Sequence, residues 1–293
     1  MKRDILDSPR LLEFKKHRRK VFRNNFFLFF IALLVIFASL SYLSRLKQLN
    51  IGAIEIIGNK VVETEAVKKV VEEQIAGKYL WLFPKTNILF YPQNSIKNEL
   101  QDKFKRLNNI SLSIKNNKIL MVSLTERTAL YTWCGDIPNL AVKPPSELGG
   151  LTAKDQCYFM DENGYIFDEA PYFSGEVYFK FYGAQSESYF FKQKFKQLIA
   201  FKDILINLGL KPVILRITDS GEVEVFLSKG TSSILTIGPK IIFKIDADFQ
   251  NVAENLETAL NTEPLKSKFK NKYSLLEYID LRFGNKVYDK FSN

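Results

Sequence analysis

Hydrophobic and polar positions along the chain mark one long apolar stretch, followed by two regions of short elements. Residues 26–44 read FFLFFIALLVIFASLSYLS and contain no charge, Pro or Gly. At about 1.5 Å per residue, a helix of these nineteen residues covers roughly 28 Å, close to the hydrocarbon thickness of about 30 Å. A buried core helix would carry polar residues along one face, whereas only Ser39, Ser41 and Ser44 interrupt this stretch. The pattern predicts a membrane-spanning helix over residues 26–44.

The elements that follow predict a small domain over residues 50–128. β-Branched residues at positions 51–57 indicate a strand that stops at Gly58 and Asn59, a pair suited to positive φ. A helix is expected to begin at Thr64 and to end near Gly77. A second helix is expected to begin near residues 94–95, with its apolar residues on one face at Ile96, Leu100, Phe104 and Leu107.

Two strands complete this first outer domain. Apolar and polar residues alternate over residues 110–114 and again over residues 120–124, with Asn116 and Asn117 between them. The predicted order is therefore β-α-α-β-β, and two helices on one face of a small sheet make a compact α+β unit. A short connection over residues 45–48 holds this unit close to the bilayer.

Residues 129–293 predict a second domain, a mixed and mainly antiparallel sheet with two helices. A hairpin is expected around Asp161-Glu162-Asn163-Gly164, because primed turns favour the Asn-Gly pair. The expected strands are residues 158–160, 165–167, 177–182, 213–217, 223–227, 234–237, 279–283 and 286–288. Amphipathic helices are expected over residues 188–208 and around Phe249, Val252, Leu256 and Leu260. Gly209 and Pro212 end the first of these helices.

The charge distribution indicates topology rather than nucleic-acid binding. The chain has 42 Lys and Arg against 32 Asp and Glu, a net charge of +10. Residues 1–25 alone hold nine basic and three acidic side chains, a local net charge of +6. The other 268 residues hold 33 basic and 29 acidic side chains, and this dispersed +4 is a poor footprint for nucleic acid.

The basic residues also predict orientation. Nine precede the apolar stretch and only Arg45 and Lys47 follow it closely, so the tail is expected in the cytoplasm and residues 45–293 outside it. A cleaved signal peptide is the alternative. Its apolar core is normally shorter, and Leu40 spoils an A-x-A-like site at Ala38, although Ser39 and Ser41 form a weaker one.

Candidate catalytic residues are scarce. The only histidine, His17, lies in the tail, which excludes Ser-His-Asp and Cys-His catalysis and His-rich zinc sites from the outer domains. The acidic residues Asp161, Glu162, Asp168 and Glu169 are compatible with a glycosidase pair, but a solvated hairpin turn is the favoured interpretation. They lack the ligand spacing of a calcium loop, and no phosphate- or dinucleotide-binding glycine pattern occurs. The sequence predicts no enzyme, no metal and no cofactor.

The two cysteines, Cys134 and Cys157, both fall in the part of the chain that is expected outside the cytoplasm, where disulfides persist. A disulfide between them is the favoured hypothesis, and two separately buried thiols are the alternative. Without a nearby histidine, two sulfurs do not make an ordinary zinc site.

Most aromatic residues fall at core spacing, which favours packing over ligand stacking. The exceptions lie in the connection between the first two helices, at Tyr79, Trp81, Phe83, Phe90 and Tyr91. These residues either cover the core of the small domain or form an interaction surface.

Four short motifs occur in order along this layout: Ile54-Glu55-Ile56-Ile57-Gly58-Asn59, Leu124-Thr125-Glu126-Arg127, Asp161-Glu162-Asn163-Gly164 and Ile279-Asp280-Leu281-Arg282-Phe283. With these motifs, the layout as a whole resembles the FtsQ/DivIB family of cell-division proteins, in which the first outer domain is a POTRA domain. The likeness runs through the whole chain in the family's order.

The resemblance implies a non-enzymatic divisome scaffold in the cell (inner) membrane, expected at the division septum. Its partners would be FtsB/DivIC-like and FtsL-like proteins, and the terminal strand of the second domain would bind them by strand addition. Asp280 and Arg282 are expected to point away from the core side, which Ile279, Leu281 and Phe283 occupy. The expected partner-binding residues are Arg282, Phe283, Gly284, Asn285, Lys286, Val287 and Tyr288.

Two other classes of protein stay open. A POTRA-bearing translocation or assembly chaperone would also bind strands, although such proteins usually repeat the unit. An anchored cell-wall hydrolase would need a catalytic constellation that the sequence does not supply.

Overall fold

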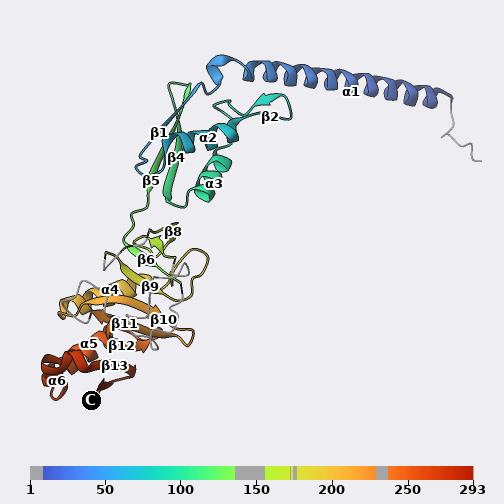
Figure 1. Ribbon diagram of the computed structural model, residues 1–293. Helices are drawn as coiled ribbons and strands as arrows, with labels where there is room; N and C mark the ends of the chain where they lie inside the picture. Colours follow the sequence, from blue (N-terminus) through green and yellow to red (C-terminus); the bar gives the residue numbers. More distant parts are fainter. Residues whose placement is uncertain (1–8, 136–155, 172, 174–176, 229–236, 293) are drawn as a thin grey trace, which may run out of the picture. The chain divides into compact units, whose positions relative to one another are not determined.

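A computed structural model describes residues 9–135, 156–171, 173, 177–228 and 237–292 (Figure 1). The chain divides into two compact units, Met1–Glu126 and Arg127–Asn293. Each unit has its own hydrophobic core. The protein is α+β.

The first unit begins with one long helix, α1 (Pro9–Ser44), which extends the predicted apolar stretch into the basic tail. From His17 to Ser44 it is long and apolar enough to cross a membrane by length and composition. All side chains from position 17 to 43 are exposed except Ser41, so burial in a protein core does not explain the apolar composition. A short 3-10 turn, η2 (Lys47–Leu49), follows.

The sheet of the first unit has the order β1-β5-β4. β1 (Ala53–Ile57) pairs parallel with β5 (Ile119–Glu126), and β4 (Leu107–Lys115) pairs antiparallel with β5. Asn116 and Asn117 join β4 to β5 with φ angles of 52° and 54°, a conformation that asparagine tolerates better than most residues.

Two amphipathic helices supply the other half of this core. They are α2 (Thr64–Ile75) and α3 (Gln93–Lys103). The predicted α2 stripe is buried, and so are Ile96 and Leu100 of α3. Leu107 is buried but lies in β4 rather than on the second helix, so that part of the prediction was wrong. α3 ends at Lys103, and the backbone N–H of Leu107 bonds to the Phe104 carbonyl in the turn that follows.

The aromatic connection between these helices contains a hairpin that the pattern did not predict. Its strands are β2 (Lys78–Tyr79) and β3 (Phe83–Pro84). Each strand has only two residues, too few for alternation to be visible in the sequence.

The second unit is built on a nine-stranded mixed sheet with the order β14-β13-β12-β11-β10-β9-β6-β7-β8. Most neighbouring pairs are antiparallel, and β13–β12, β10–β9 and β9–β6 are parallel. The strands are β6 (Tyr131–Trp133), β7 (Tyr158–Met160), β8 (Ile166–Glu169), β9 (Phe179–Tyr182), β10 (Pro212–Ile217), β11 (Glu222–Ser228), β12 (Ile237–Lys244), β13 (Leu276–Phe283) and β14 (Lys286–Phe291).

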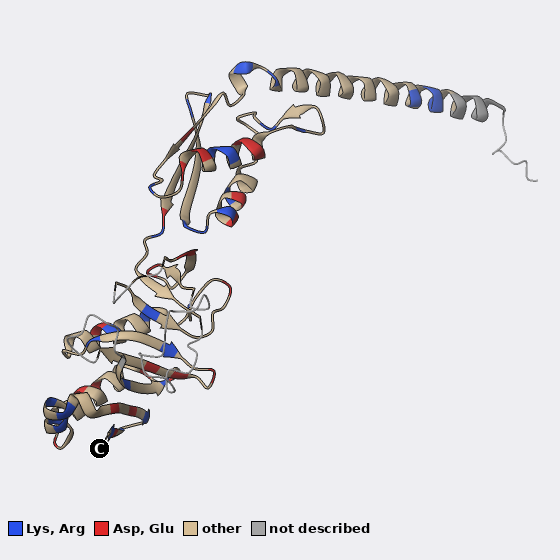
Figure 2. Cartoon of the chain, in the orientation of Figure 1, with Lys and Arg blue, Asp and Glu red and all other residues tan. Residues whose placement is uncertain are grey.

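Helices cover one face of this sheet. They are α4 (Phe195–Asn207), α5 (Phe249–Asn261) and α6 (Leu265–Lys272), and a 3-10 turn, η3 (Tyr273–Leu275), leads into β13. Alternate residues of the central strands, such as Val225, Ile241 and Ile279, pack with α4 and α5 in the main core. α6 was not predicted, because its sequence is mostly polar, with Lys266, Lys268, Lys270 and Lys272 (Figure 2).

The structure corrects the helix that was predicted over residues 188–208. α4 begins only at Phe195, because Ser188 and Phe191 have φ angles of 138° and 42°, which a helix excludes. Their segment pairs with the β7–β8 hairpin: the N–H of Phe190 bonds to the Gly164 carbonyl at 2.9 Å. This tertiary pairing overrides the local helical period.

The strand predicted at residues 234–237 falls almost wholly outside the described part of the chain. β12 runs from Ile237 to Lys244, and residues 234–236 lie outside the described part of the chain. β12 has eight residues, and its register with β11 places Ile241 and Phe243 on the core side.

Glu126 and Arg127 are adjacent in sequence, but each binds its own unit. The Glu126 carboxylate accepts hydrogen bonds from the backbone N–H groups of Lys60, Val61 and Val62 at 2.7–3.0 Å. Arg127 donates to Asp161 at 2.5 Å, and its guanidinium lies 3.8 Å from the centre of the Tyr165 ring. These contacts account physically for the Glu-Arg pair and for the first Asp of the Asp161–Gly164 hairpin.

Candidate functional site

The sheet of the second unit ends in β14 on one side and in β8 on the other, and β14 is the end strand that contains part of the predicted partner-binding segment. β13 pairs with β12 on one side and with β14 on the other, so the strand at 279–283 has no free edge. The expectation that this strand would present its own edge was therefore wrong. Gly284 and Asn285 turn the chain back, and Lys286–Phe291 takes the end position in the sheet. Among the described residues, no strand pairs with the outer side of β14.

β14 has two different faces because successive side chains of a strand point to opposite sides. Val287 and Phe291 pack against the main core. Lys286, Tyr288 and Lys290 are exposed on the opposite face. The strand is six residues long, and its lysines are the kind of charge that keeps an edge from pairing with the wrong chain.

Two exposed aromatic rings lie together beside this edge. Phe283 is 56% exposed and Tyr288 is 50% exposed, and their ring centres lie 5.4 Å apart in an edge-to-face arrangement. Phe283 was predicted on the core side with Ile279 and Leu281. It is exposed instead, because the register of β13 against β14 shifts between Asp280 and Phe283. The pair is a small apolar surface on a sheet edge.

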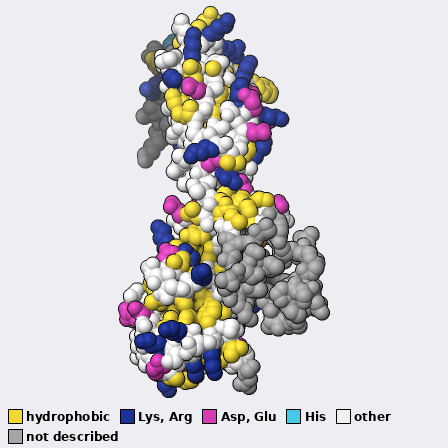
Figure 3. Space-filling model, turned by 60° about the vertical axis from the view of Figure 1, so that its left-hand side comes forward, with side chains coloured by type: hydrophobic (Ala, Val, Ile, Leu, Met, Phe, Trp, Pro, Cys, Tyr) yellow, Lys and Arg dark blue, Asp and Glu magenta, His cyan; other side chains and the backbone are white. Residues whose placement is uncertain are grey.

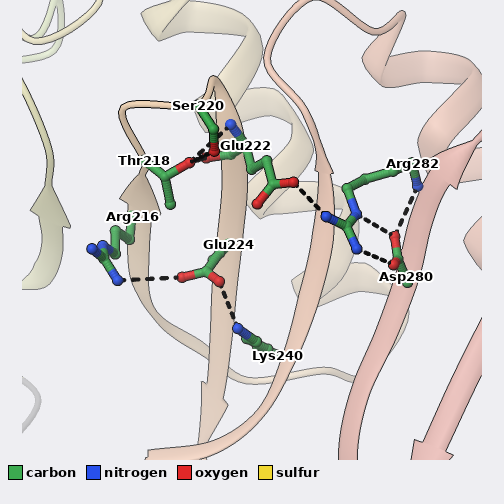
Figure 4. Close-up of polar contacts among 8 residues, drawn as sticks. All are labelled: Arg216, Thr218, Ser220, Glu222, Glu224, Lys240, Asp280 and Arg282. Atoms are coloured by element: carbon green, nitrogen blue, oxygen red, sulfur yellow. Dashed lines mark hydrogen bonds and ion pairs between the residues drawn. The ribbon is translucent and has the colours of Figure 1, made fainter. Parts of the chain in front are cut away.

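Arg282 is engaged inside the sheet (Figure 4). Its Nε donates to Asp280 Oδ1 at 2.8 Å and its Nη2 to Asp280 Oδ2 at 2.5 Å, a bidentate pair. Its Nη1 also donates to Glu222 Oε1 on β11. The side chains of Arg282 and Asp280 therefore lie on the face opposite Ile279 and Leu281, as expected. The hydrogen bonds of the Arg282 guanidinium, however, are made within the sheet, to Asp280 and Glu222.

Asp280 shows what Arg282 does for the sheet. Its side chain is buried, and burial by itself raises the pKa of the carboxyl. Hydrogen bonds from the Arg282 side chain and backbone N–H, with the charges of Arg282 and Lys240, outweigh burial, so the pKa of Asp280 lies below its usual range. The carboxylate is charged at neutral pH and held by Arg282.

The same face carries a second charged cluster on the neighbouring strands (Figure 4). Glu224 of β11 is buried and accepts from Lys240 of β12 at 2.5 Å, and Arg216 of β10 lies 3.8 Å from its other oxygen. Both clusters lie on the face opposite α4 and α5, because Glu222 and Glu224 alternate with the core residues Val223 and Val225. On the face of the second unit that Figure 3 shows, hydrophobic side chains gather together, with Lys and Arg side chains scattered among and around them.

The remaining predicted partner-binding residues fall in or next to the β13–β14 turn. Gly284 has a φ of +65°, and its carbonyl accepts from the Asn255 side chain of α5 at 3.3 Å. Asn285 and Lys286 are exposed, whereas Val287 is half-buried against the core. The structure thus brings Phe283, Asn285, Lys286 and Tyr288 to one accessible edge, and leaves Arg282 and Val287 to structural contacts.

A disulfide joins Cys134, at the end of β6, to Cys157, at the start of β7. It closes a loop whose residues 136–155 lie outside the described part of the chain. On the loop-entropy model such a link stabilises the fold by about 3 kcal/mol.

One of the acidic hairpin residues, Asp161, has structural partners. Asp161 is buried, pairs with Arg127, and accepts the backbone N–H groups of Asn163 and Tyr165. Within the described ranges, no group of three or more His, Cys, Asp or Glu side chains is placed to hold a metal ion.

Comparison with known proteins adds no assignment. Neither the protein-family models nor the curated proteins that were searched match this chain.

Proposed function

We propose that this chain is a non-enzymatic scaffold of the cell-division machinery, anchored in the cell membrane by α1, with a POTRA domain as its first outer unit. It belongs, on this proposal, with the FtsQ/DivIB proteins that its motifs resemble. It binds an FtsB/DivIC-like partner, and with it an FtsL-like one, by strand addition along β14.

The open edge of β14 carries this proposal. A partner segment that adds to β14 gains backbone hydrogen bonds, and it covers the exposed pair Phe283 and Tyr288. Aromatic residues that lie centrally in an interface often supply much of its affinity. Lys286, on the exposed face of the same strand, favours a partner segment with acidic residues beside its apolar ones, whereas Lys290 already pairs with Glu277 at 2.7 Å.

The charge of the tail supports the orientation that the proposal needs. Basic residues precede the apolar stretch 26–44 in excess, which favours a cytoplasmic tail with residues 45–293 outside the cytoplasm. The disulfide between Cys134 and Cys157 agrees with an oxidising compartment.

Site-specific photocrosslinking tests the edge. The full-length protein, expressed in its own cell, would carry a photoreactive amino acid at position 283 or 288. Ile206, which is 50% exposed on α4 of the same unit, is the matched control position. We expect the first two positions to trap the same small membrane protein of the FtsB/DivIC type and position 206 to trap none. Equal adducts at all three positions would sink the edge proposal.

Binding affinity supplies a second test. The double variant Phe283→Ala with Tyr288→Ala should weaken binding of a DivIC-like ectodomain to the solubilised full chain by roughly tenfold or more, measured by calorimetry. Ile206→Ala should leave the affinity unchanged. Arg282→Glu is a poorer probe, because it would place a second carboxylate beside Asp280 and disturb the sheet itself.

Localisation separates the divisome from the chaperone alternative. A fluorescent protein fused to the N-terminus should collect at mid-cell before septation. A uniform membrane signal would favour a POTRA-bearing assembly chaperone, which would use the same edge for a different class of client.

A further inference from the structure

Two neighbouring loops of the first unit expose large apolar side chains. One is the turn between β2 and β3, and the other precedes α3. Leu80 and Trp81 are 82% and 89% exposed, and Leu89 and Phe90 are 69% and 62% exposed. Leu82 is 41% exposed. Such side chains at a water-exposed surface are unfavourable unless something apolar covers them.

The first loop is bonded to the end of the apolar helix. The Ser41 hydroxyl donates to the Leu82 carbonyl at 3.0 Å, and the Arg45 guanidinium donates to the same oxygen at 3.4 Å. Ser41 lies three residues before the end of α1, which is about 4.5 Å along the helix. The hairpin therefore extends back alongside the apolar part of α1 (Figure 1).

Asn87 attaches the second loop to the same helix end. Its side-chain amide donates to the Ser44 carbonyl at 3.0 Å, and its Oδ1 accepts the backbone N–H of Leu89 at 3.0 Å. The Asn87 side chain is buried, with 1% of the residue exposed. Asn50 also donates to the Ser44 carbonyl, at 2.9 Å. These bonds hold both apolar loops beside the last turn of α1.

The backbone of the hairpin turn is unusual for its residues. Leu80 and Trp81 have φ angles of 48° and 61°, a left-handed conformation that L side chains rarely adopt. A β-turn whose two central residues both have positive φ favours Asn-Gly at those positions. Large apolar residues in strained positions at a loop tip are a mark of function.

We propose that Leu80, Trp81, Leu82, Leu89 and Phe90 insert into the interface of the lipid bilayer that α1 spans, as a second membrane contact beside the helix. This proposal rests on the membrane anchoring proposed above. It is additional to partner binding at β14, which lies in the other unit.

The chemistry of the two loops fits lipid. Trp is enriched at the boundary between headgroups and hydrocarbon, where its ring is amphipathic. Lys78 and Lys85 flank the hairpin tip, and the Lys85 ammonium lies 5.7 Å from the centre of the Tyr79 ring. Lysines next to inserted apolar residues can pair with lipid phosphates. The inserted loops would keep the first unit close against the membrane rather than leave it tethered by a single helix.

Tryptophan fluorescence tests the insertion. The chain has two tryptophans, so Trp133→Phe leaves Trp81 as the only emitter in the full-length protein. The protein would be reconstituted in phosphatidylcholine and phosphatidylglycerol liposomes. One set would be brominated near the headgroup end of the acyl chains and another near the bilayer centre. We expect the Trp81 emission to be blue-shifted. Lipids brominated near the headgroup end should quench most of this emission, and lipids brominated near the bilayer centre should quench little of it.

The matched control is Val61→Trp in a chain with Trp81→Phe and Trp133→Phe. Val61 is 65% exposed in the same unit, but it follows the far end of β1 from α1. Its emission should stay at the wavelength of water-exposed tryptophan and should resist both brominated lipids.

Flotation of the liposomes distinguishes a failure of the loop insertion from a failure of the proposed membrane span by α1. If the protein floats with the liposomes but Trp81 emits at the same water-exposed wavelength as the tryptophan of Val61→Trp, the insertion is overturned and the membrane span stands. Protein that does not float would overturn the span, and the insertion with it. Thermal unfolding that matches the unsubstituted chain confirms that the variants are folded.

Discussion

Gly58 and the Leu124 carbonyl oxygen are so close that a β-carbon on Gly58 would lie 2.0 Å from that oxygen. Gly58 also has a φ of +94°. Gly58→Ala should destabilise the first unit by more than about 4 kcal/mol, because the β1 end must move away from β5. Hydrogen exchange of residues 50–126, followed by mass spectrometry, measures this loss.

Gly77→Ala is the control for that prediction. Gly77 has a similar φ of +85°, but nothing lies within 4 Å of its added β-carbon. It should cost about 1–2 kcal/mol, the conformational penalty alone. Equal losses for the two variants would show that the contact with Leu124 does not matter.

Glu126 stabilises the first unit only when it is charged. Burial raises the pKa of its carboxyl, but three backbone N–H bonds and the charge of Arg106 lower it more, so the pKa lies below its usual value. Its contribution is therefore complete above the unfolded pKa of about 4.3 and is lost as the pH falls through the lower folded pKa. Glu126→Gln should cost about 1 kcal/mol at neutral pH.

A pH series of unfolding measurements checks this prediction. The stability of the first unit should fall less steeply below about pH 4.3 in Glu126→Gln than in the unsubstituted protein. Glu73→Gln, at an exposed position on α2, should not change the slope. An unaltered slope in Glu126→Gln would contradict the assignment.

Arg282→Ala should destabilise the second unit by about 3 kcal/mol, because the buried Asp280 carboxylate would lose its bidentate partner. Adding Asp280→Asn removes the unpaired charge and should restore part of that loss. Hydrogen exchange of β12–β14 measures both effects. If the stability losses of Arg282→Ala and Asp280→Asn simply add in the double variant, the two residues are not coupled.

The Cys134–Cys157 disulfide should be worth about 3 kcal/mol to the second unit. Replacing both cysteines with serine should lower its melting temperature, and reductant should lower that of the unsubstituted protein by a similar amount. Reductant should have no effect on the double variant. Two free thiols in non-reducing mass spectrometry of the membrane-derived protein would contradict the link.

Local patterns in the sequence predicted the elements whose cause is local. α1 follows from an uninterrupted apolar stretch, and the buried face of α2 from Val67, Val70, Val71 and Ile75 at helical spacing. The β4–β5 hairpin follows from alternation on both sides of Asn116 and Asn117. In each case the residues that decide the structure lie within one or two turns or strands of each other.

The candidate site was predicted less well. The segment from Arg282 to Tyr288 was marked by a resemblance, but the end strand on this side of the sheet proved to be β14, and Phe283 proved to be exposed. A strand's position in a sheet depends on which distant strands pair with it, and the shift of register beside Phe283 depends on β14. Neither the position of a strand in the sheet nor this register shift can be recognised from the alternation of apolar and polar residues within the strand.

The sequence by itself determined a stretch long and apolar enough to span a membrane, the excess of charge on its tail and the core side of most strands and helices, because these follow from the order of apolar and polar residues. Only the tertiary structure decided that Arg282 is held by Asp280 and Glu222, that Ser188–Lys194 is not helical, and that Leu82 lies beside Ser41. Each of these contacts or conformations depends on segments brought together by the fold, and the bonding and packing between them outweigh what either segment prefers alone.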